Sequence, residues 1–262
     1  MEDRLGQHAS MLHGFTDDGI LMLESFPPVG PVAPPTRNRL LAALPPRELE
    51  RMLEWLESVE LVLRHIIYEP HASIQHVYFP TSGAVSMIIL APEGAVEVGS
   101  VGNEGFTGVC TLLFADSMPT RAIVQAEGEA YRMKVGIFRA LVNESLPMRR
   151  LFARYTLALS NQAAQSVACN RLHSLEARCA RWLLLSHDRV DGNFIVLTQE
   201  FLSYMLGVHR PAVTLAAGTL QKAGLIHSSR GMIEITNRPG LEEAACGCYQ
   251  AMRDDLDELV HS

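Results

Sequence analysis

The chain has 262 residues, of which 48% are hydrophobic, so it is long enough for two domains with sizeable cores and is not a wholly disordered protein. Its five cysteines show no disulfide-framework spacing, which fits a reducing compartment. No apolar run approaches the length of a membrane span, and Met1-Glu2-Asp3 does not begin a signal peptide. We therefore expect a cytoplasmic protein that makes no membrane contact.

The net charge of −7 is divided unevenly along the chain. Residues 1–144 hold 10 Lys and Arg against 18 Asp and Glu (−8), residues 145–240 hold 11 against 5 (+6), and residues 241–262 hold 1 against 6 (−5). A positive segment of this size favours contact with a phosphate backbone, although such an imbalance also arises by chance.

The first half of the chain has three segments that differ in composition and hydrophobic pattern. Residues 1–36 are weakly patterned and end in closely spaced prolines, so we expect a flexible arm. Residues 38–57 have helical leucine spacing on both sides of Pro45-Pro46. From residue 59 to 135, Val, Ile and Tyr are enriched and glycines recur at short intervals, which predicts many short strands in a barrel or sandwich.

A long helix is predicted next. Ser145 can cap it, Pro147 fits its first turn, and the pattern continues to about Asn170. It has two apolar stripes, namely Leu151, Tyr155, Ala158, Gln162, Gln165 and Cys169, and Phe152, Leu159, Ala163 and Val167. A helix that is apolar on two sides must be covered on two sides. The β-region can supply one cover, and we expect a second copy of the chain to supply the other, which predicts a homodimer; burial within one subunit is the alternative.

Residues 197–226 have the pattern of a helix-turn-helix. Leu202 and Leu206 fall four apart on a first helix that starts at Gln199. Gly207 stands where the chain must turn sharply, and a second helix starts near Arg210 with a proline in its first turn. Taken alone, the match could also be an ordinary helical hairpin.

The second helix has a buried stripe of Val213, Ala216 and Leu220, and Gly224 ends it. Its opposite face is free to meet a groove and carries His209, Arg210, Ala212, Thr214, Leu215 and Gly218. A polar turn over residues 227–231 between two short apolar runs predicts a β-hairpin. A helix-turn-helix followed by such a hairpin is a winged helix.

Two further helices are expected around this motif. Ser174 can cap one that leads into the winged helix. The acidic residues 241–262 have apolar residues at helical spacing, but the sequence names no partner for them.

A glycine-rich β-region, a long helix and a winged helix, in this order, resemble the Crp/Fnr family of bacterial transcription regulators over about residues 38–240. The most specific parts are IYEP at 67–70, VYFP at 77–80, residues 176–189 and the helix-turn-helix. The resemblance implies an α+β fold with a β jelly roll of the cyclic-nucleotide-binding type. The expected parts are an arm (1–36), a jelly-roll sensor domain with flanking helices (37–144), a dimerisation helix (145–170), a winged-helix DNA-binding domain (171–240) and an acidic C-terminal helix or tail (241–262).

The resemblance also implies a function. Members bind double-stranded DNA with two-fold symmetry as homodimers and recruit or obstruct RNA polymerase. No nucleophile elbow, Walker loop, metal motif or paired-carboxylate signature is present, so we do not expect an enzyme. The alternative is a ligand-binding module that controls a protein partner and uses its winged helix for protein contact.

Site residues follow from the aligned positions. Arg210 corresponds to the arginine that the family uses on a guanine, where a bidentate contact to O6 and N7 explains the side chain. Pro211 stands where an acidic residue often follows, so one base contact is lost. Ala212 and Thr214 are candidates for a thymine methyl or a base edge. The expected phosphate contacts are Thr198, which could alternatively be only a helix cap, with Gln199, His209 and, in the hairpin turn, Arg230.

The sensor residues depart from the family pattern. Cyclic-nucleotide-binding members carry a Gly-Glu dipeptide and then Arg followed by Ser or Thr and Ala. Here Phe106 replaces the Glu, and Thr120-Arg121-Ala122 reverses the later order, which on a strand turns a side chain to the other face. We predict that cyclic AMP is not bound in the usual way and leave the effector open. Glu104, Thr107 and Arg121 are candidates for lining a pocket, with loop and rim residues as the alternative.

Metal cofactors are not expected. The clustered N-terminal cysteines that hold an iron–sulfur cluster in some members are absent. Cys246-Gly247-Cys248 would need two further ligands to hold zinc, so we predict no metal site. We expect the scattered cysteines to be buried small apolar residues, with a redox role as the alternative.

Overall fold

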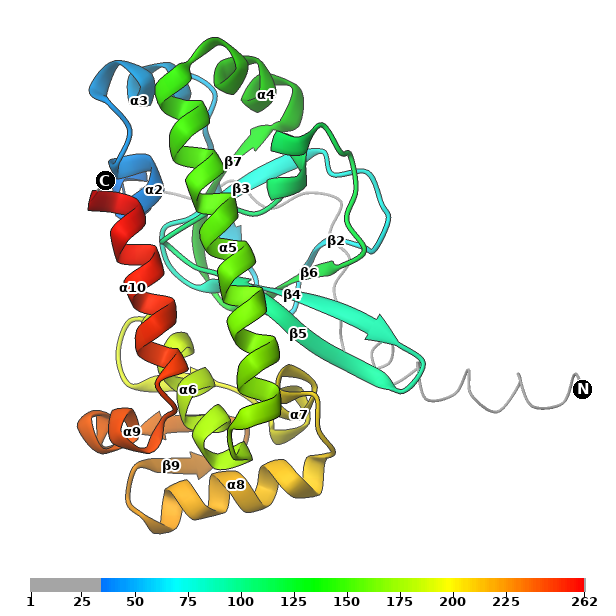
Figure 1. The fold of residues 1–262 in the computed structure, drawn as a ribbon, viewed down its shortest axis with the longest axis vertical. Coiled ribbons are helices and arrows are strands. Elements are labelled where there is room, and N and C mark those ends of the chain that lie inside the picture. The colour runs from blue at the N-terminus through cyan, green and yellow to red at the C-terminus, as the bar shows by residue number, and fades with distance from the viewer. Residues whose placement is uncertain (1–33, 262) are drawn as a thin grey trace, which may run out of the picture.

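The computed structural model describes residues 34–261, so the predicted arm lies outside the described residues except for its last three (Figure 1). In chain order the elements are η2 (Pro35–Arg37), α2 (Arg39–Ala42), α3 (Pro46–Leu53), β1 (Glu57–Leu61), β2 (Ile66–Tyr68), β3 (His76–Pro80), β4 (Ala84–Ala91), β5 (Gly94–Val101), η3 (Val109–Leu113), β6 (Arg121–Ala126), β7 (Gly128–Lys134), α4 (Val135–Glu144), α5 (Leu146–Leu172), α6 (Leu175–His187), β8 (Phe194–Val196), α7 (Gln199–Leu206), α8 (Arg210–Lys222), β9 (Ile226–Ser229), β10 (Met232–Ile235), α9 (Arg238–Ala244) and α10 (Cys248–His261). None of the described helices is both long and apolar enough to cross a membrane.

The N-terminal helical region is shorter than predicted. Pro45 separates α2 from α3, and Glu57 already pairs with Arg132 of β7. Asn38 holds this region on the β-domain, because its side-chain amide donates to the carbonyls of Pro80 and Gly105, both at 2.8 Å. The same side chain accepts the N–H of the third residue of α2, so one buried residue caps a helix and connects it to the end of β3 and to the loop after β5.

The predicted β jelly roll is confirmed. One antiparallel sheet has the order β1-β7-β3 and the other the order β2-β6-β4-β5. An aromatic cluster fills the core between this domain, α4 and α5. Phe106 lies at its centre, fully buried, with ring centroids 5.3 Å from Phe138, 5.4 Å from Phe152 and 5.3 Å from Tyr155. Each such pair adds to the free energy gained from burying the rings.

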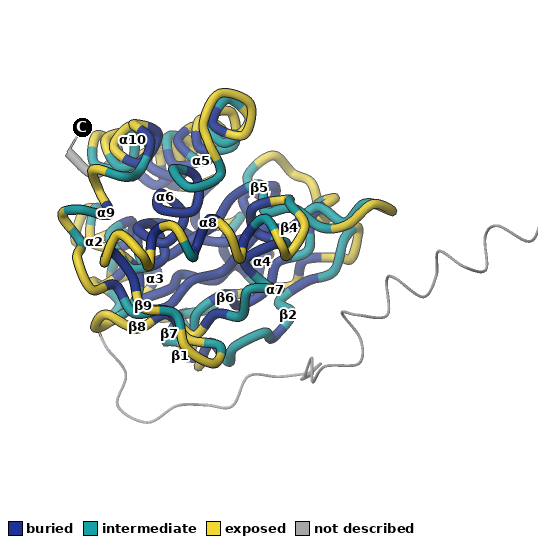
Figure 2. The backbone as a smooth tube through the Cα atoms, turned by 90° about the horizontal axis from the view of Figure 1, so that it is seen from below, coloured by how far each residue is buried: buried dark blue, intermediate teal, exposed yellow. Residues whose placement is uncertain are grey.

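The long helix α5 is confirmed, with Ser145 accepting the backbone N–H of Met148 at 3.3 Å as its cap. Leu151 and Tyr155, from the first predicted stripe, and Phe152, from the second, pack into the β-domain core. Figures 1 and 2 show α10 lying alongside α5. The second cover of α5 is therefore the acidic tail of the same chain.

Helix α10 runs antiparallel to α5, as two hydrogen bonds show. Gln165, near the end of α5, donates to Sγ of Cys248 at 3.0 Å, and Arg154, near its start, donates to the carbonyl of Glu258 at 3.0 Å. The partner that the sequence could not assign to the tail is thus the long helix.

A third face of α5 stays open in the subunit. Its exposed residues alternate by four and three positions and are Ala153, Leu157, Ser160, Ala164 and Val167. Leu157 is 62% exposed and Val167 is 71% exposed. The two predicted stripes are mostly covered, with Val167 as the clearest exception, so the open surface is largely a stripe that the sequence analysis did not name.

The C-terminal winged helix is confirmed with two differences. Its sheet has three strands in the order β8-β10-β9, because the three residues of β8 pair with β10. The hairpin turn is Arg230-Gly231 alone, not the predicted five residues. Both have positive φ, 37° and 81°, and two left-handed residues form the tight turn that matches the twist of a hairpin.

The winged helix and the four-stranded sheet share one core. Ile88 of β4 and Ile123 of β6 are buried in the same cluster as the apolar residues of α6, α7 and α8. The C-terminal domain therefore does not hang from a linker but packs directly on the β-domain.

A ring of hydrogen bonds, buried at Gln125 and Ser186 and half-buried at Glu97, crosses this contact. Trp182 of α6 donates to Oε1 of Glu97 at 3.0 Å, and Oε2 of Glu97 lies 2.5 Å from Oγ of Ser86. That Oγ lies 2.8 Å from Oε1 of Gln125, whose amide nitrogen donates to Oγ of Ser186 at 2.7 Å. Ser186 in turn donates to the Trp182 carbonyl at 3.0 Å and closes the ring.

Counting protons in this ring places one on Glu97. Ser186 uses its only proton on the Trp182 carbonyl, which fixes Gln125 with its oxygen toward Ser86. Ser86 must then give its single proton to Gln125 and accept from Glu97. Desolvation, the largest effect, raises the pKa of Glu97 and agrees with a neutral carboxyl.

Replacing Glu97 with Gln should preserve the ring, because an amide can donate to Ser86 and accept from Trp182. Wild-type protein loses stability as the pH rises from the unfolded-state value of about 4.3 through the raised pKa, whereas Glu97→Gln does not. The difference in Tm between Glu97→Gln and wild type should therefore grow as the pH rises above about 5. Glu93→Gln, in the exposed β4–β5 turn, is the control and should show a constant difference. Parallel pH profiles for Glu97→Gln and wild type would contradict the buried neutral carboxyl.

Candidate nucleic-acid interface

The first helix of the predicted motif is built as expected. The hydroxyl of Thr198 caps α7 by accepting the N–H of Phe201 at 3.1 Å, and Leu202 and Leu206 are buried. Gly207 has φ of 62°, and a Cβ at this position would also lie 3.0 Å from Cγ2 of Val96. Only glycine meets both conditions without strain, because the absence of a Cβ permits both the positive φ and the close contact with β5.

The second helix, α8, turns one face inward and one outward. Val213, Ala216 and Leu220 are buried against α6 and α7, as predicted. Arg210 is exposed in the first turn, where the helix has free backbone N–H groups and His209 supplies no side-chain cap. The rest of the outward face includes Ala212, which is half-buried, and the exposed Thr214, Leu215 and Thr219.

Two predicted contact residues also hold the helices together. The Thr214 hydroxyl lies 2.8 Å from Oε1 of Gln199 and 3.1 Å from the carbonyl of Arg210. Gln199 thus links the first turn of α7 to the outward face of α8. The spacing between the two helices is set by side chains that themselves border the outer surface.

The wing lies beside the start of α7. The N–H of Leu197 donates to the carbonyl of Gly231 at 2.8 Å, which holds the Arg230-Gly231 turn next to Thr198. Arg230 is exposed at the tip. The hairpin and the cap of α7 therefore present one continuous edge.

The charge of residues 145–240 is not all at this edge. Arg178, Arg181 and Arg189 are buried, and Arg189 pairs with Glu104 at 2.7 Å. The exposed cations of the winged helix are Arg210 and Arg230, with Lys222 at the end of α8. The net charge of +6 over residues 145–240 therefore overstates the positive charge at the surface of the winged helix.

The three expected sensor residues have separate partners. Glu104 is buried with Arg189 and accepts the N–H of Gly102 at 2.9 Å. Oγ1 of Thr107 accepts the backbone N–H of Tyr78 at 3.3 Å, and Arg121 forms a two-pronged ion pair with Glu69. Of the three, Glu104 alone lines one of the pockets described, a space of about 290 Å³ between α2, α6 and α10.

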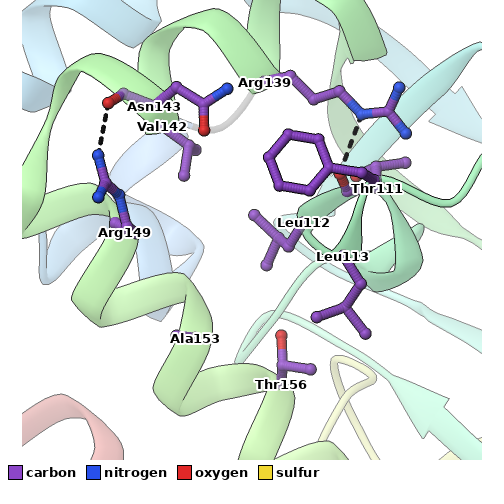
Figure 3. A pocket seen from close by; sticks show the side chains of 10 residues that line it. Thr111, Leu112, Leu113, Arg139, Val142, Asn143, Arg149, Ala153 and Thr156 are labelled. Carbon is purple, nitrogen blue, oxygen red and sulfur yellow. Dashed lines mark hydrogen bonds between the residues drawn. The ribbon is translucent and has the colours of Figure 1, made fainter.

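A pocket of about 350 Å³ lies between η3, α4 and α5 (Figure 3). Its two arginines are tied to the backbone, since Arg139 donates to the Thr111 carbonyl at 2.9 Å and Arg149 to the Asn143 carbonyl at 2.6 Å. The rest of the lining is mostly apolar and includes Leu112, Leu113, Phe114, Val142 and Ala153. No sequence motif pointed to this pocket, because three separate elements contribute to it.

The cysteines are less scattered than the sequence indicated. Cys169, Cys246 and Cys248 form a small buried cluster at the end of α5, with His173 beside them. The two further ligands that the Cys246-Gly247-Cys248 segment lacked in sequence are therefore close in space. The spacing of Cys169 and His173, one helical turn apart, was the only signal available.

The fold is shared with solved Crp/Fnr structures. A Crp/Fnr-family transcriptional regulator from Eubacterium rectale aligns with a TM-score of 0.62 and 19% identity over 80% of this chain and 98% of that one. A CRP-family regulator from Thermus thermophilus gives 0.60 and 19% over 71% and 95%. The cyclic di-GMP-responsive global regulator of Xanthomonas campestris gives 0.56 and 18% over 72% and 98%.

A search of curated proteins found no match. The family model of the Crp-like helix-turn-helix domain matches residues 177–244, which include α7, α8 and the wing. The expected resemblance is therefore confirmed: this chain carries a Crp-like helix-turn-helix domain within the fold of the Crp/Fnr family of transcriptional regulators.

Proposed function

We propose that the chain is a sequence-specific DNA-binding transcription regulator that acts as a cytoplasmic homodimer on a two-fold-symmetric operator. The observation that carries the proposal is the exposed first turn of α8, with Arg210 outward and the wing arginine at the edge beside α7. Two such helices related by dimer symmetry would enter major grooves about one helical turn apart. The bound dimer would recruit or obstruct RNA polymerase, and no chemical step is assigned to it.

Arg210 is proposed to read a guanine, and its neighbours to fix the register. A guanidinium fork matches O6 and N7 of guanine, whereas Ala212 and Thr214 suit a methyl group or a base edge. Thr198, Gln199, His209 and Arg230 border the same surface and suit phosphates, which position the protein without reading sequence. Thr198 can fill this role only through its backbone or a shared hydroxyl, because its side chain already caps α7.

Arg210→Ala should weaken binding to the preferred operator by roughly 1–3 kcal/mol and relax specificity at one G·C pair. The operator is first selected from random duplexes by the wild-type protein, and affinities are measured on it and on a scrambled duplex at several salt concentrations. Arg230→Ala is the matched comparison. It should weaken both duplexes alike and lower the salt slope by about one. Equal affinity of wild type and Arg210→Ala for both duplexes would refute the base contact, and salt-independent binding would favour the protein-contact alternative.

The dimer interface is proposed to be the open face of α5. Exposed Leu157 and Val167 alternate there with small residues, which allow a second helix to approach closely. Leu113 and Phe114, 71% and 72% exposed, line the same pocket as Ala153 of this stripe and extend it. An apolar surface of this kind is where a soluble subunit meets a partner, and a symmetry-related α5 offers the same stripe in return.

Leu157→Glu should convert the dimer to a monomer, because each copy would place a carboxylate at the centre of an apolar helix pair. Light scattering coupled to size-exclusion chromatography measures the mass directly. Leu215→Glu is the control, since Leu215 is 73% exposed but lies on α8. That variant should remain a dimer. A wild-type monomer at micromolar concentration, or a dimer that survives Leu157→Glu, would contradict this interface.

The regulator is proposed not to be gated by cyclic AMP in the usual way. The side chain at the position of the family's ribose-binding Glu is Phe106, which lies in the centre of the aromatic cluster. Arg121, the candidate for the phosphate, is held by Glu69 at 2.8 Å. Neither residue is placed to hold a nucleotide without rearranging the core.

Calorimetric titration with cyclic AMP up to about 1 mM should therefore give no saturable heat. The same preparation should bind its operator, which shows that the protein is active. Saturable binding at micromolar concentration would overturn this part of the proposal.

A further inference from the structure

We propose that Cys169, His173, Cys246 and Cys248 form a binding site for one zinc ion. The four donor atoms, three Sγ and one imidazole nitrogen, all lie within 4.8 Å of one another. Sγ of Cys169 is 3.4 Å from Sγ of Cys246, and Sγ of Cys248 is 3.5 Å from Nδ1 of His173. Tetrahedral zinc with Zn–S of about 2.3 Å and Zn–N of about 2.0 Å separates its ligand atoms by about 3.5–3.8 Å.

The backbone brings these donors together in pairs. Cys169 and His173 are one turn apart at the end of α5, so both side chains project from the same side of the helix. Cys246 lies between α9 and α10, and Cys248 begins α10. Because α10 packs antiparallel on α5, the start of one meets the end of the other and the two pairs face each other.

Buried positive charge gives an independent reason for thiolates here. Arg178 and Arg181 are buried, and their Nε atoms have no hydrogen-bond partner among residues 34–261. Neither forms an ion pair with Asp or Glu in the described part of the chain. Arg178 instead interacts electrostatically with Cys169 and Cys246, and Arg181 with Cys169. Zinc with three thiolates and a neutral imidazole carries one net negative charge, which these guanidinium groups would offset.

A second layer of contacts also suits a metal. Gln165 donates from its amide nitrogen to Sγ of Cys248 at 3.0 Å, as hydrogen-bond donors around zinc thiolates do. All four ligands come from the protein, which is the closed arrangement of structural zinc sites and not the open one of catalytic sites. Soft sulfur donors with one imidazole in a tetrahedral arrangement select zinc over the hard cations.

A zinc ion bound to these residues would act on the junction between α5 and α6. His173 is the C-cap of α5, and Ser174 is the N-cap of α6. A metal on these ligands would tie the acidic C-terminal segment to that junction, so the ion would fix the start of the DNA-binding domain relative to the long helix. Binding to the folded form alone would also stabilise the protein.

Metal analysis of the full-length protein, purified without chelators, tests the site. We expect about one zinc per chain, and protein expressed with cobalt(II) should show thiolate-to-cobalt charge-transfer and strong tetrahedral ligand-field bands. Cys246→Ser and His173→Ala should each bind less than about a tenth of this zinc. Cys110→Ser is the matched control, because Cys110 is a buried cysteine outside the cluster. It should keep the full complement.

Gln165→Ala removes no ligand and covers the case in which a ligand variant fails to fold. It should keep its zinc but release it to a competing chelator with an affinity about 10–100-fold weaker than wild type. Three results would overturn the proposal. They are wild-type protein with less than about a tenth of a zinc per chain and no cobalt charge-transfer band, full zinc in Cys246→Ser, or a Cys169–Cys246 disulfide in protein kept under the reducing conditions of the cytosol.

Discussion

The arrangement of the whole chain depends on covering a single helix. Helix α5 has 27 residues and apolar side chains on several sides, and each apolar side in water costs free energy in proportion to its area. The aromatic core of the β-domain covers the side that carries Phe152 and Tyr155, and α10 covers the next. The side with Leu157 stays exposed in the subunit.

The DNA-binding domain is placed by polar groups as well as by its apolar core. Ile88 and Ile123 are the buried apolar residues that the sheet contributes to this core, with Ile66, Leu90 and Ala95 partly buried against it, but apolar packing alone specifies orientation poorly. The hydrogen-bond ring through Glu97 and Trp182 and the Arg189–Glu104 ion pair fix the orientation of this domain. A buried polar group that loses its partner costs more free energy than a small shift in an apolar contact. The outward face of α8 is thus oriented partly by residues of the β-domain.

Local signals in the sequence were sufficient for the starts of three helices and for the turn between α7 and α8. Ser145, Ser174 and Thr198 each cap the helix predicted for them, and Gly207 has the left-handed φ that its turn required. These signals work because a cap or a turn involves only neighbouring residues. The helical region predicted for residues 38–57 was too long, because a non-local contact decides its end: Glu57 already pairs with Arg132 of β7.

The contacts between distant segments could not be read in the same way. The β8 strand has three residues and is defined only by its pairing with β10. The open stripe of α5 could not be predicted, because hydrophobic spacing does not say which segment covers which face of a helix. In the structure α10 covers one of the predicted faces. The cluster of Cys169 with Cys246 joins residues 77 positions apart, and no spacing rule spans that distance.

The junction after α5 is where these separate contacts act on the DNA-binding surface. Arg178, the fourth residue of α6, interacts electrostatically with the Cys169 and Cys246 thiols and donates through a terminal guanidinium nitrogen to the carbonyl of Leu206 at 2.6 Å. Leu206 is the last residue of α7, directly before the Gly207 turn. A single buried side chain therefore connects the end of the long helix to the turn of the helix-turn-helix. Since the guanidinium is rigid and desolvated, a change in charge or position at the thiol cluster alters the energy of that hydrogen bond directly. The tail, which supplies two of the three thiols, is therefore separated from the turn before α8 by one side chain, that of Arg178.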